Sequence, residues 1–522
     1  MAMPSNSCWL SDEAKSIDCI CLGTGRFLRS VLVPALVEAK LKPALIQTRG
    51  NNFLEYMTTR TDGTYEVDTV LPSGEIQTST VPCYAAFTLG SVAGKAAWME
   101  FLQRQPPSIQ LIGVGVTEAG LATSQTQAMQ ELFHLLVYLR LHNTYTSELC
   151  VVDMDNVPDN GDTIRSHMMH LCGTDNAPMK LYLETRVVFC NTMVDRITSQ
   201  REGSDGLIPR CEPLPNKALV ILDINQRLPE AIGTLTHLGV VVRSTPEELD
   251  ADIALKLRVA NGTHTALAHC MALMRLLNTD ILSRGGLLMN YLDSLFQSQI
   301  LPGSTFGTLE TKLVYEDWRS RLSHPHFGLS TFFITQNGAA KGGIRFGPTV
   351  IDLLEQGKPI TTCMVYAWAS LLRWLTPTTL SSQDGVFTGW LDGKGHNEMD
   401  GESVSYADGL QYNLESGWYE FKCACNVQDR PLSAWLGEIA STVPQPSDYV
   451  SVVRAYLMAP DGGNLARVAQ KSDFEVLVQA ISTLLVRMVV GDGMEDLLDE
   501  MIHKNGIYEQ GFATNARVLC WI

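Results

Sequence analysis

The chain has 522 residues, of which 45% are hydrophobic and 18% are charged, and its formal net charge is −17. This composition predicts a soluble globular protein that is long enough for two or three domains. It argues against a nucleic-acid-binding protein, because there is no basic stripe to neutralise phosphates. It also argues against a membrane protein, because no uninterrupted run of 18 or more apolar residues is present.

The N-terminus and the cysteines bear on the cell compartment. The first residues lack a basic segment followed by an apolar core, so they do not predict a signal peptide. The 13 cysteines are scattered without a C-x-x-C pair, and Cys423 and Cys425 are too close together for an ordinary zinc knuckle. We therefore expect reduced, mostly buried thiols in a cytoplasmic protein without a structural metal.

The first predicted elements are a strand, a glycine turn and a helix. Residues 17–22 form a short apolar run, Gly23 and Gly25 follow it, and residues 27–39 have a helical pattern. This order opens a dinucleotide-binding βαβ unit, in which glycines let the backbone approach a pyrophosphate at the helix N-terminus. The third glycine of the full fingerprint is missing, so a Gly-rich turn in another kind of α/β protein stays open.

The second predicted strand, at residues 43–48, ends at Arg49. Sites that prefer NAD usually carry an acidic residue at this strand end for the ribose hydroxyls, and none is present here. Arg49 suits the 2′-phosphate of NADP, or else it is a solvated loop arginine. The cofactor is therefore expected to be NAD or NADP.

Four further apolar runs are candidate buried strands, at residues 109–116, 150–154, 186–190 and 218–224. Helical stretches separate them, which is typical of an α/β protein with a mostly parallel sheet. Ligands of open α/β sheets bind beyond the carboxyl ends of the strands. We therefore expect cofactor and substrate contacts in the polar segments after the first three runs, which hold Thr117, Glu118, Asn156 and Asp195.

Beyond about residue 245 the chain changes character. Strand-like alternation is scarce, and helical patterns cover residues 250–279, 284–300, 308–322, 345–356, 360–375 and 472–503. A Gly/Ser/Asp/Asn-rich stretch at about 377–430 predicts a long surface insertion, with or without a hairpin. We therefore expect a Rossmann-type domain over residues 1–245 and a mainly α-helical substrate domain over residues 246–522.

Three polar residues stand out in the mostly apolar helical run near residue 256. In a continuous α-helix Lys256, Asn261 and His264 fall within an arc of roughly 140°, and Lys256, Ala260 and His264 form an i, i+4, i+8 row. A lysine, an amide and an imidazole that converge can remove a proton from an alcohol and hold the alkoxide. The alternative is a helix with one solvated lysine and a core histidine. His269 is expected in the core, and it does not complete an H-E-x-x-H zinc motif.

Five motifs, in order along about 250 residues, resemble the polyol-specific long-chain dehydrogenases, which include mannitol 2-dehydrogenases, mannitol-1-phosphate dehydrogenases, and fructuronate and tagaturonate reductases. The motifs are G-T-G-R-F-L-R (23–29), T-E-A-G (117–120), D-N-V-P-D-N-G (155–161), F-C-N-T-M-V-D-R-I (189–197) and K-L-R-V-A-N-G-T-H-T-A-L (256–267). The resemblance implies a zinc-independent hydride transfer between substrate and nicotinamide.

The resemblance also implies roles for individual residues. Lys256 is the general acid/base, Asn156 and Asn261 donate amide N–H groups to the developing alkoxide, and His264 bonds a neighbouring substrate hydroxyl or orients the lysine. The residues implied at the cofactor are Gly23, Gly25 and Phe27 in the first turn, Thr117 and Glu118 at the diphosphate-ribose side, and Val194 and Asp195 at the nicotinamide. Without the resemblance, Asn156 and Asp195 are equally well read as turn residues at strand ends.

The substrate stays open on the sequence alone. Lys341 and Arg345 suit an anionic end of the substrate, or else they form an exposed basic loop. Several family members carry an arginine as a substrate clamp where this chain has Phe333.

The function predicted is an NAD(P)-dependent oxidoreductase that interconverts a secondary alcohol and a ketone on a small linear polyol or sugar acid, in a monomer or homodimer. The alternatives are a phosphorylated polyol as the substrate, or a non-catalytic sensor or scaffold that kept the fold.

Overall fold

The computed structural model describes residues 7–376 and 430–504, apart from positions 12, 15, 105, 106, 117, 205, 275, 336 and 441, together with four strands between residues 387 and 421. The chain divides into an N-terminal unit, residues 1–253, and a C-terminal unit, residues 254–522. This division lies eight residues beyond the predicted boundary at 245/246, within helix α9 (Pro246–Leu255).

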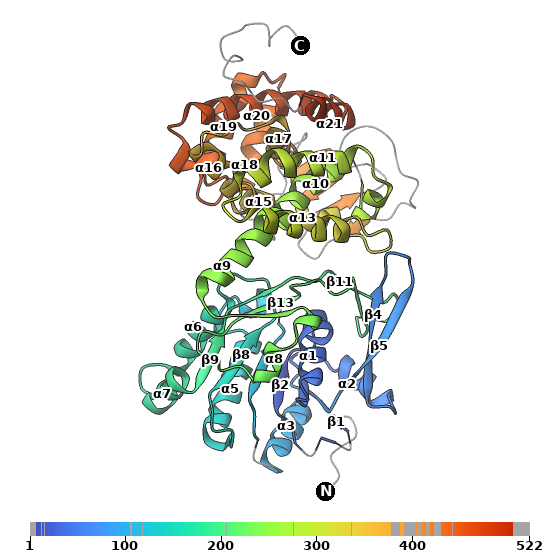
Figure 1. Ribbon diagram of the computed structural model, residues 1–522, viewed down its shortest axis with the longest axis vertical. Coiled ribbons are helices and arrows are strands. Elements are labelled where there is room, and N and C mark those ends of the chain that lie inside the picture. The colour runs from blue at the N-terminus through green and yellow to red at the C-terminus, as the bar shows by residue number, and fades with distance from the viewer. Residues whose placement is uncertain are drawn as a thin grey trace. The chain divides into compact units, whose positions relative to one another are not determined.

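The N-terminal unit is built on a seven-stranded sheet with the order β1-β6-β3-β2-β7-β8-β9 (Figure 1). Only the pair β1–β6 is antiparallel within it. The strands are β1 (Cys8–Leu10), β2 (Cys19–Leu22), β3 (Pro43–Gln47), β6 (Ala85–Thr88), β7 (Leu111–Val114), β8 (Leu149–Asp153) and β9 (Val187–Cys190). The six parallel strands have the doubly wound order of dinucleotide-binding folds, so the predicted Rossmann-type α/β fold is confirmed.

Alternate residues of the central strands feed two separate cores, because successive side chains of a strand point to opposite faces. Cys19 and Cys21 of β2 pack with η1 (Leu28–Leu32), α1 (Val33–Glu38) and α2 (Asn52–Thr59). Ile20 and Leu22 face the other core, formed with α3 (Val92–Arg104), α5 (Gln127–His142), α6 (Asn160–Cys172) and α7 (Ala177–Thr185). Helices thus cover both faces of the sheet.

Two smaller sheets complete the N-terminal unit. One has the order β11-β12-β4-β5 and contains a hairpin that the sequence analysis did not predict. The other, β10-β13-β14, contains the predicted strand at 218–224, which we had expected in the main sheet. The strands are β4 (Thr64–Val70), β5 (Ile76–Pro82), β10 (Thr192–Val194), β11 (Thr198–Gln200), β12 (Pro209–Cys211), β13 (Leu219–Leu222) and β14 (Val240–Arg243).

The C-terminal unit is mainly helical, as predicted. Its buried helix α17 packs against α10 and α20 and has no polar face along its length, which is typical of a helix surrounded by others. The helices are η3 (Lys256–Asn261), α10 (Gly262–Leu273), α11 (Leu287–Leu295), η5 (Phe296–Ile300), α12 (Leu301–Gly303), α13 (Thr308–Leu322), α14 (Thr331–Thr335), α15 (Gly338–Arg345), α16 (Gly347–Glu355), α17 (Thr362–Trp374), α18 (Arg430–Ala440), α19 (Pro446–Met458), α20 (Ser472–Val490) and α21 (Met494–His503).

Two long predicted helices are interrupted. The pattern at 250–279 is divided by the π-helical turn η3 and ends at Leu273. The pattern at 472–503 breaks between α20 and α21, because Gly491 caps α20 with a positive φ of 102°.

Most of the predicted insertion at 377–430 lies outside the described residues. Its described strands form an antiparallel sheet of the order β15-β18-β17-β16, with β15 (Phe387–Trp390), β16 (Ser403–Ser405), β17 (Leu410–Asn413) and β18 (Trp418–Phe421). Across the described part of the chain, no helix is both long and apolar enough to cross a bilayer. Ten cysteines are described as free thiols, and all but Cys8 are buried.

Candidate functional site

The predicted glycine turn lies at the switch point of the sheet. Strand β2, which comes first in the chain among the six parallel strands, pairs with β3 on one side and with β7 on the other. Gly23 leaves β2 with φ of 106°, and a Cβ there would clash with the carbonyl oxygen of Gly115 at the end of β7. Glycine is therefore required at Gly23 for both the left-handed backbone and the close approach of the two turns.

The rest of the turn is partly open to solvent. Gly25 is exposed and Phe27 is half-buried. Arg29 is buried and fixes the turn from beneath, because its Nε donates to the carbonyl of Thr24 at 2.8 Å and its Nη2 to that of Gly206 at 2.9 Å. Sequence reasoning missed this role of Arg29, although the residue belongs to a quoted motif.

For the other predicted cofactor residues of the first half of the sheet, the structure gives less information about the side chains. Arg49 is exposed beyond β3. Thr117 lies outside the described residues, and Glu118 begins the short helix α4 (Glu118–Leu121), of which only the backbone is described at that position. Their cofactor contacts stay predictions.

Asn156 lies in a loop that the side chain of Asn160 stabilises by hydrogen bonds. The buried side chain of Asn160 donates to the carbonyl of Asp155 at 3.0 Å and to the hydroxyl of Thr192 at 2.8 Å, and accepts from the backbone N–H of Thr192 at 2.9 Å. Asn156 itself is exposed at the carboxyl end of β8. Since it belongs to the N-terminal unit, its convergence with Lys256 stays a prediction.

The same strand ends in an unusual carboxyl group. Asp153 is fully buried, and one of its carboxyl oxygens has no hydrogen-bond partner. Burial, together with the negative charge of Asp155, raises the pKa of Asp153 to about 7. Sequence reasoning missed this residue, because a strand-end aspartate carries no signal of its burial.

The motif at 189–197 contains buried residues that have structural contacts, and the predicted cofactor roles of Val194 and Asp195 stay predictions. Val194 is fully buried in β10, and Asp195 is half-buried beside it. Buried Arg196 donates to the carbonyl of Ser30 at 2.6 Å and to that of Glu212 at 2.9 Å. These bonds tie the helix after the glycine turn to the smaller sheets, so this segment positions the turn.

In the C-terminal unit the lysine helix differs from the expected geometry. Residues 256–261 form a π-helical turn, in which the repeat is about i+5 instead of i+4. The expected row of Lys256, Ala260 and His264 is therefore wrong, and Ala260 is buried in the core. Because the π-helical turn contains one extra residue, Asn261 takes the place one turn after Lys256 that Ala260 would have in an α-helix. His264 follows Asn261 by three residues and so lies near it on the helix surface. All three side chains are half-buried.

His264 is neutral, and its tautomer follows from its partner. Burial, and the positive charges of Arg345, Lys341 and Lys256, lower the pKa of His264 well below its usual range. Nη1 of Arg345 lies 3.2 Å from Nε2 of His264. Because arginine only donates, Nε2 accepts, and the ring proton resides on Nδ1, which is buried without a partner.

Helix α15 supplies the two basic residues predicted for the substrate. Lys341 donates to the carbonyl of Ile334 at 2.6 Å, and Arg345 donates to the hydroxyl of Thr265 as well as to His264. The positive charges of Lys341, Arg345 and Lys256 all act on His264. Below we call Lys256, His264, Lys341 and Arg345 the cationic cluster.

Two neighbours of the cluster differ in character. His269 is fully buried, as expected, and its Nδ1 bonds the carbonyl of Thr265 at 2.7 Å. Burial foremost, with Lys341 and Arg345 adding to it, lowers its pKa to about 3. Phe333, where the resemblance led us to expect a clamp arginine, is 66% exposed and forms no part of the core.

Chemically, the cationic cluster offers two amines, a guanidinium and an imidazole as hydrogen-bonding groups, and Asn261 follows Lys256 on the same helical turn. Among the described residues, no group of three or more His, Cys, Asp and Glu side chains is arranged to hold a metal ion. The cluster is suited to hold a substrate oxygen and to exchange a proton with it.

Comparison with known proteins finds sequence similarity in the N-terminal unit. Residues 17–229 match the family described as the mannitol dehydrogenase Rossmann domain. The mannitol 2-dehydrogenase of Cereibacter sphaeroides is 31% identical over 163 residues, which cover 29% of this chain and 32% of that enzyme. The match thus spans about a third of the length of this relative.

Solved structures extend the likeness in fold to nearly the whole chain. A D-sorbitol dehydrogenase in substrate-free form has a TM-score of 0.65 at 16% identity, covering 95% of this chain and 98% of that one. The Pseudomonas fluorescens mannitol 2-dehydrogenase, in a ternary complex with NAD and D-mannitol, has a TM-score of 0.58 at 14% identity, covering 94% and 95%. At these identities the likeness is one of fold.

Proposed function

We propose that this chain, whose residues 17–229 belong to the mannitol dehydrogenase Rossmann domain family, is an NAD(P)-dependent oxidoreductase that interconverts a secondary alcohol and a ketone on a linear polyol or sugar acid. The observation that carries the proposal is the π-helical turn, which puts Asn261 one turn along from Lys256, beside a neutral His264.

Lys256 is the proposed general acid/base. In oxidation its neutral amine takes the proton of the substrate hydroxyl, and in reduction its ammonium returns a proton to the alkoxide. The positive charges of Lys256, Lys341 and Arg345 all act on the imidazole of His264. The proton chemistry is thus assigned to a side chain, without zinc.

The amides and the imidazole hold the substrate. Asn261, with Asn156 from the N-terminal unit, donates N–H groups to the oxygen that gains negative charge, and one such donor is typically worth about 3–4 kcal/mol. The Nδ1–H of His264 is available to the oxygen of an adjacent substrate hydroxyl.

The glycine turn is the proposed pyrophosphate site. Gly25 is exposed at the switch point between β2 and β7. Because it has no side chain, a pyrophosphate can approach its backbone closely. A bound nicotinamide supplies the acceptor of hydride in oxidation and its donor in reduction. Arg49 beyond β3 is the proposed determinant of NADP against NAD, and Thr117, Glu118 and Asp195 keep the cofactor roles predicted above.

A substrate panel tests the activity. Purified full-length protein is mixed with NADH or NADPH and with fructose, fructuronate, tagaturonate or fructose 6-phosphate, and the absorbance of the reduced nicotinamide is followed. Oxidation with at least one ketose or keto acid is expected. No oxidation with any pair would overturn the proposal and favour a non-catalytic protein. A cytoplasmic location and a monomeric or homodimeric state stay predictions.

Replacement of the base tests the mechanism. Lys256→Ala is expected to lower kcat by about 10²–10⁴-fold while the melting temperature stays the same. Lys312→Ala, which removes an exposed lysine from α13, is the matched control and should retain full turnover. Full turnover in Lys256→Ala would refute the assignment of the base even if the activity is real.

A further inference from the structure

Arg345 carries a charge that no described residue balances. Its Nη1 donates to His264 and Thr265, which are both neutral. Across the described residues its half-buried guanidinium meets no carboxylate, and its Nε and Nη2 groups have no partner. Burial lowers the pKa of Arg345 to about 10, so the group stays charged at neutral pH.

Among the described residues, no carboxylate acts on the guanidinium of Arg345, whose pKa is shifted by burial alone. The charges that act most strongly on His264 are all positive, and the neighbouring His269 is neutral. The remaining hydrogen on His264 is on Nδ1, which is a buried donor without an acceptor. Burial of the Arg345 guanidinium beside the unpaired Nδ1–H donor of His264 is unfavourable on its own. A negatively charged ligand that accepts hydrogen bonds would remove this cost.

The backbone of α15 cannot move away to relieve this imbalance. A Cβ at Gly342 would clash with Trp368, and one at Gly343 would clash with the carbonyl oxygen of Gly462. The carbonyl of Arg345 in turn lies close to Gly262, where a Cβ would be 3.2 Å from it. Close packing on these sides fixes the helix, so Arg345 is held beside the lysine helix.

We propose that Arg345 binds an oxyanion group of the substrate, a carboxylate or a phosphate on the sugar chain, through its Nε and Nη2 donors. A planar guanidinium recognises either group with two parallel hydrogen bonds. The inference rests on the proposed function, and it narrows the substrate from polyols in general to acidic sugars. Arg345 thereby acts as a specificity residue, next to the base Lys256.

A matched set of ligands separates charge from the sugar chain. D-glucitol, D-gluconate and D-glucitol 6-phosphate share a six-carbon linear chain and differ in their terminal group. Their dissociation constants are measured by titration calorimetry on the full-length protein, with and without NADH. At least one of the two anions is expected to bind about 10–100-fold more tightly than D-glucitol, as for a charge-assisted pair of hydrogen bonds. The anion that binds more tightly identifies the carboxylate or the phosphate as the natural group.

Variants assign the effect to Arg345. Arg345→Gln should remove about tenfold or more of the preference for the anion over D-glucitol. Arg345→Lys, which keeps the charge but loses the planar fork, should retain part of the preference and serves if the glutamine variant does not fold. Arg284→Gln removes an exposed arginine of the same unit and should leave the preference intact.

The outcomes are distinct from those of the activity panel. Equal binding of D-glucitol and both anions, or an anion preference that survives in Arg345→Gln, overturns the inference even if the protein oxidises NADH with neutral ketoses. Conversely, an anion preference that depends on Arg345, in a protein without turnover on any substrate, leaves the anion site standing and refutes the proposed reaction.

Discussion

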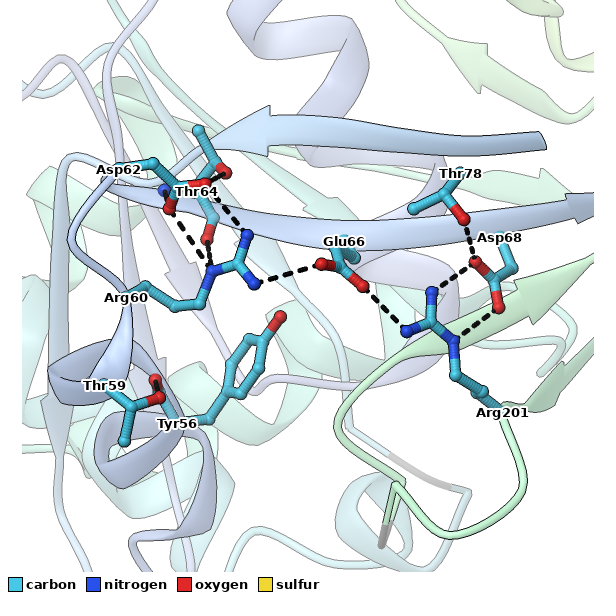
Figure 2. Close-up of polar contacts among 9 residues, drawn as sticks. All are labelled: Tyr56, Thr59, Arg60, Asp62, Thr64, Glu66, Asp68, Thr78 and Arg201. Atoms are coloured by element: carbon cyan, nitrogen blue, oxygen red, sulfur yellow. Dashed lines mark hydrogen bonds and ion pairs between the residues drawn. The ribbon is translucent and has the colours of Figure 1, made fainter.

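Arg201 in the N-terminal unit and Arg345 in the C-terminal unit are both half-buried, yet their partners differ. Figure 2 shows Arg201 donating to both carboxyl oxygens of Asp68, at 2.6 and 2.7 Å, and to Glu66 at 2.8 Å. Glu66 also accepts from Arg60 at 3.0 Å, which pairs in turn with Asp62. Two arginines thus meet three carboxylates in this network.

Arg345, by contrast, bonds two neutral side chains and lies among other cations. A network whose charges are matched joins β4 to the segment that carries Arg201 and contributes to stability. A guanidinium such as that of Arg345, which pairs with no carboxylate of the described residues, is what an anion site requires before the ligand arrives. The two regions therefore predict opposite responses to the loss of an arginine.

The largest effect on stability is expected in the matched network. Arg201→Gln leaves the carboxylate of Asp68 buried without its main partner, and the free energy of unfolding should fall by about 2–3 kcal/mol. Equilibrium unfolding in urea measures this change in the free energy of unfolding. Arg104→Gln, which removes an exposed arginine of α3, is the control and should change stability far less. An Arg201 variant as stable as the wild type would show that this network contributes nothing.

A change of similar size in the free energy of unfolding is expected when the pH is lowered, because His269 beside the cationic cluster is held neutral. The pKa of His269 is about 3 in the folded protein and about 6.5 when unfolded, so the unfolded chain binds more protons below pH 6.5 and stability is lost as the pH falls. Between pH 7 and pH 5 this histidine removes about 2 kcal/mol. His269→Gln should therefore lose about 2 kcal/mol less over this range in urea titrations at both pH values. An unchanged pH dependence would mean that His269 is not held neutral.

The smallest effect is expected at Arg345. Removing a charge that lacks a carboxylate partner relieves desolvation, which offsets the hydrogen bonds lost to His264 and Thr265. The free energy of unfolding of Arg345→Gln should stay within about 1 kcal/mol of the wild type. A loss as large as that of Arg201→Gln would mark Arg345 as a structural residue and remove the contrast between the two regions.

The strands of the main sheet were predictable because they are apolar runs bounded by turns. The hairpin β4–β5 was missed, since β5 is polar and exposed along Ile76–Thr80 and gives no buried pattern. The break between α20 and α21 had a signal in Gly491 and Gly493, which we did not use. The burial of Asp153 and the roles of Arg29 and Arg196 follow from long-range packing, which a local pattern does not encode.

By itself, the sequence determined the fold class and the identity of the lysine, amide and imidazole near residue 256, because hydrophobic periodicity and ordered motifs are local properties. The tertiary structure decided how those residues face one another. An extra residue in the turn at 256–261 moved Asn261, and not Ala260, to the position one turn from Lys256. It also placed Nη1 of Arg345, 81 residues beyond His264, 3.2 Å from Nε2 of the imidazole, while no carboxylate of the described residues pairs with Arg345. Such a placement depends on the packing of α15 against segments distant in the chain, which a local sequence pattern does not encode.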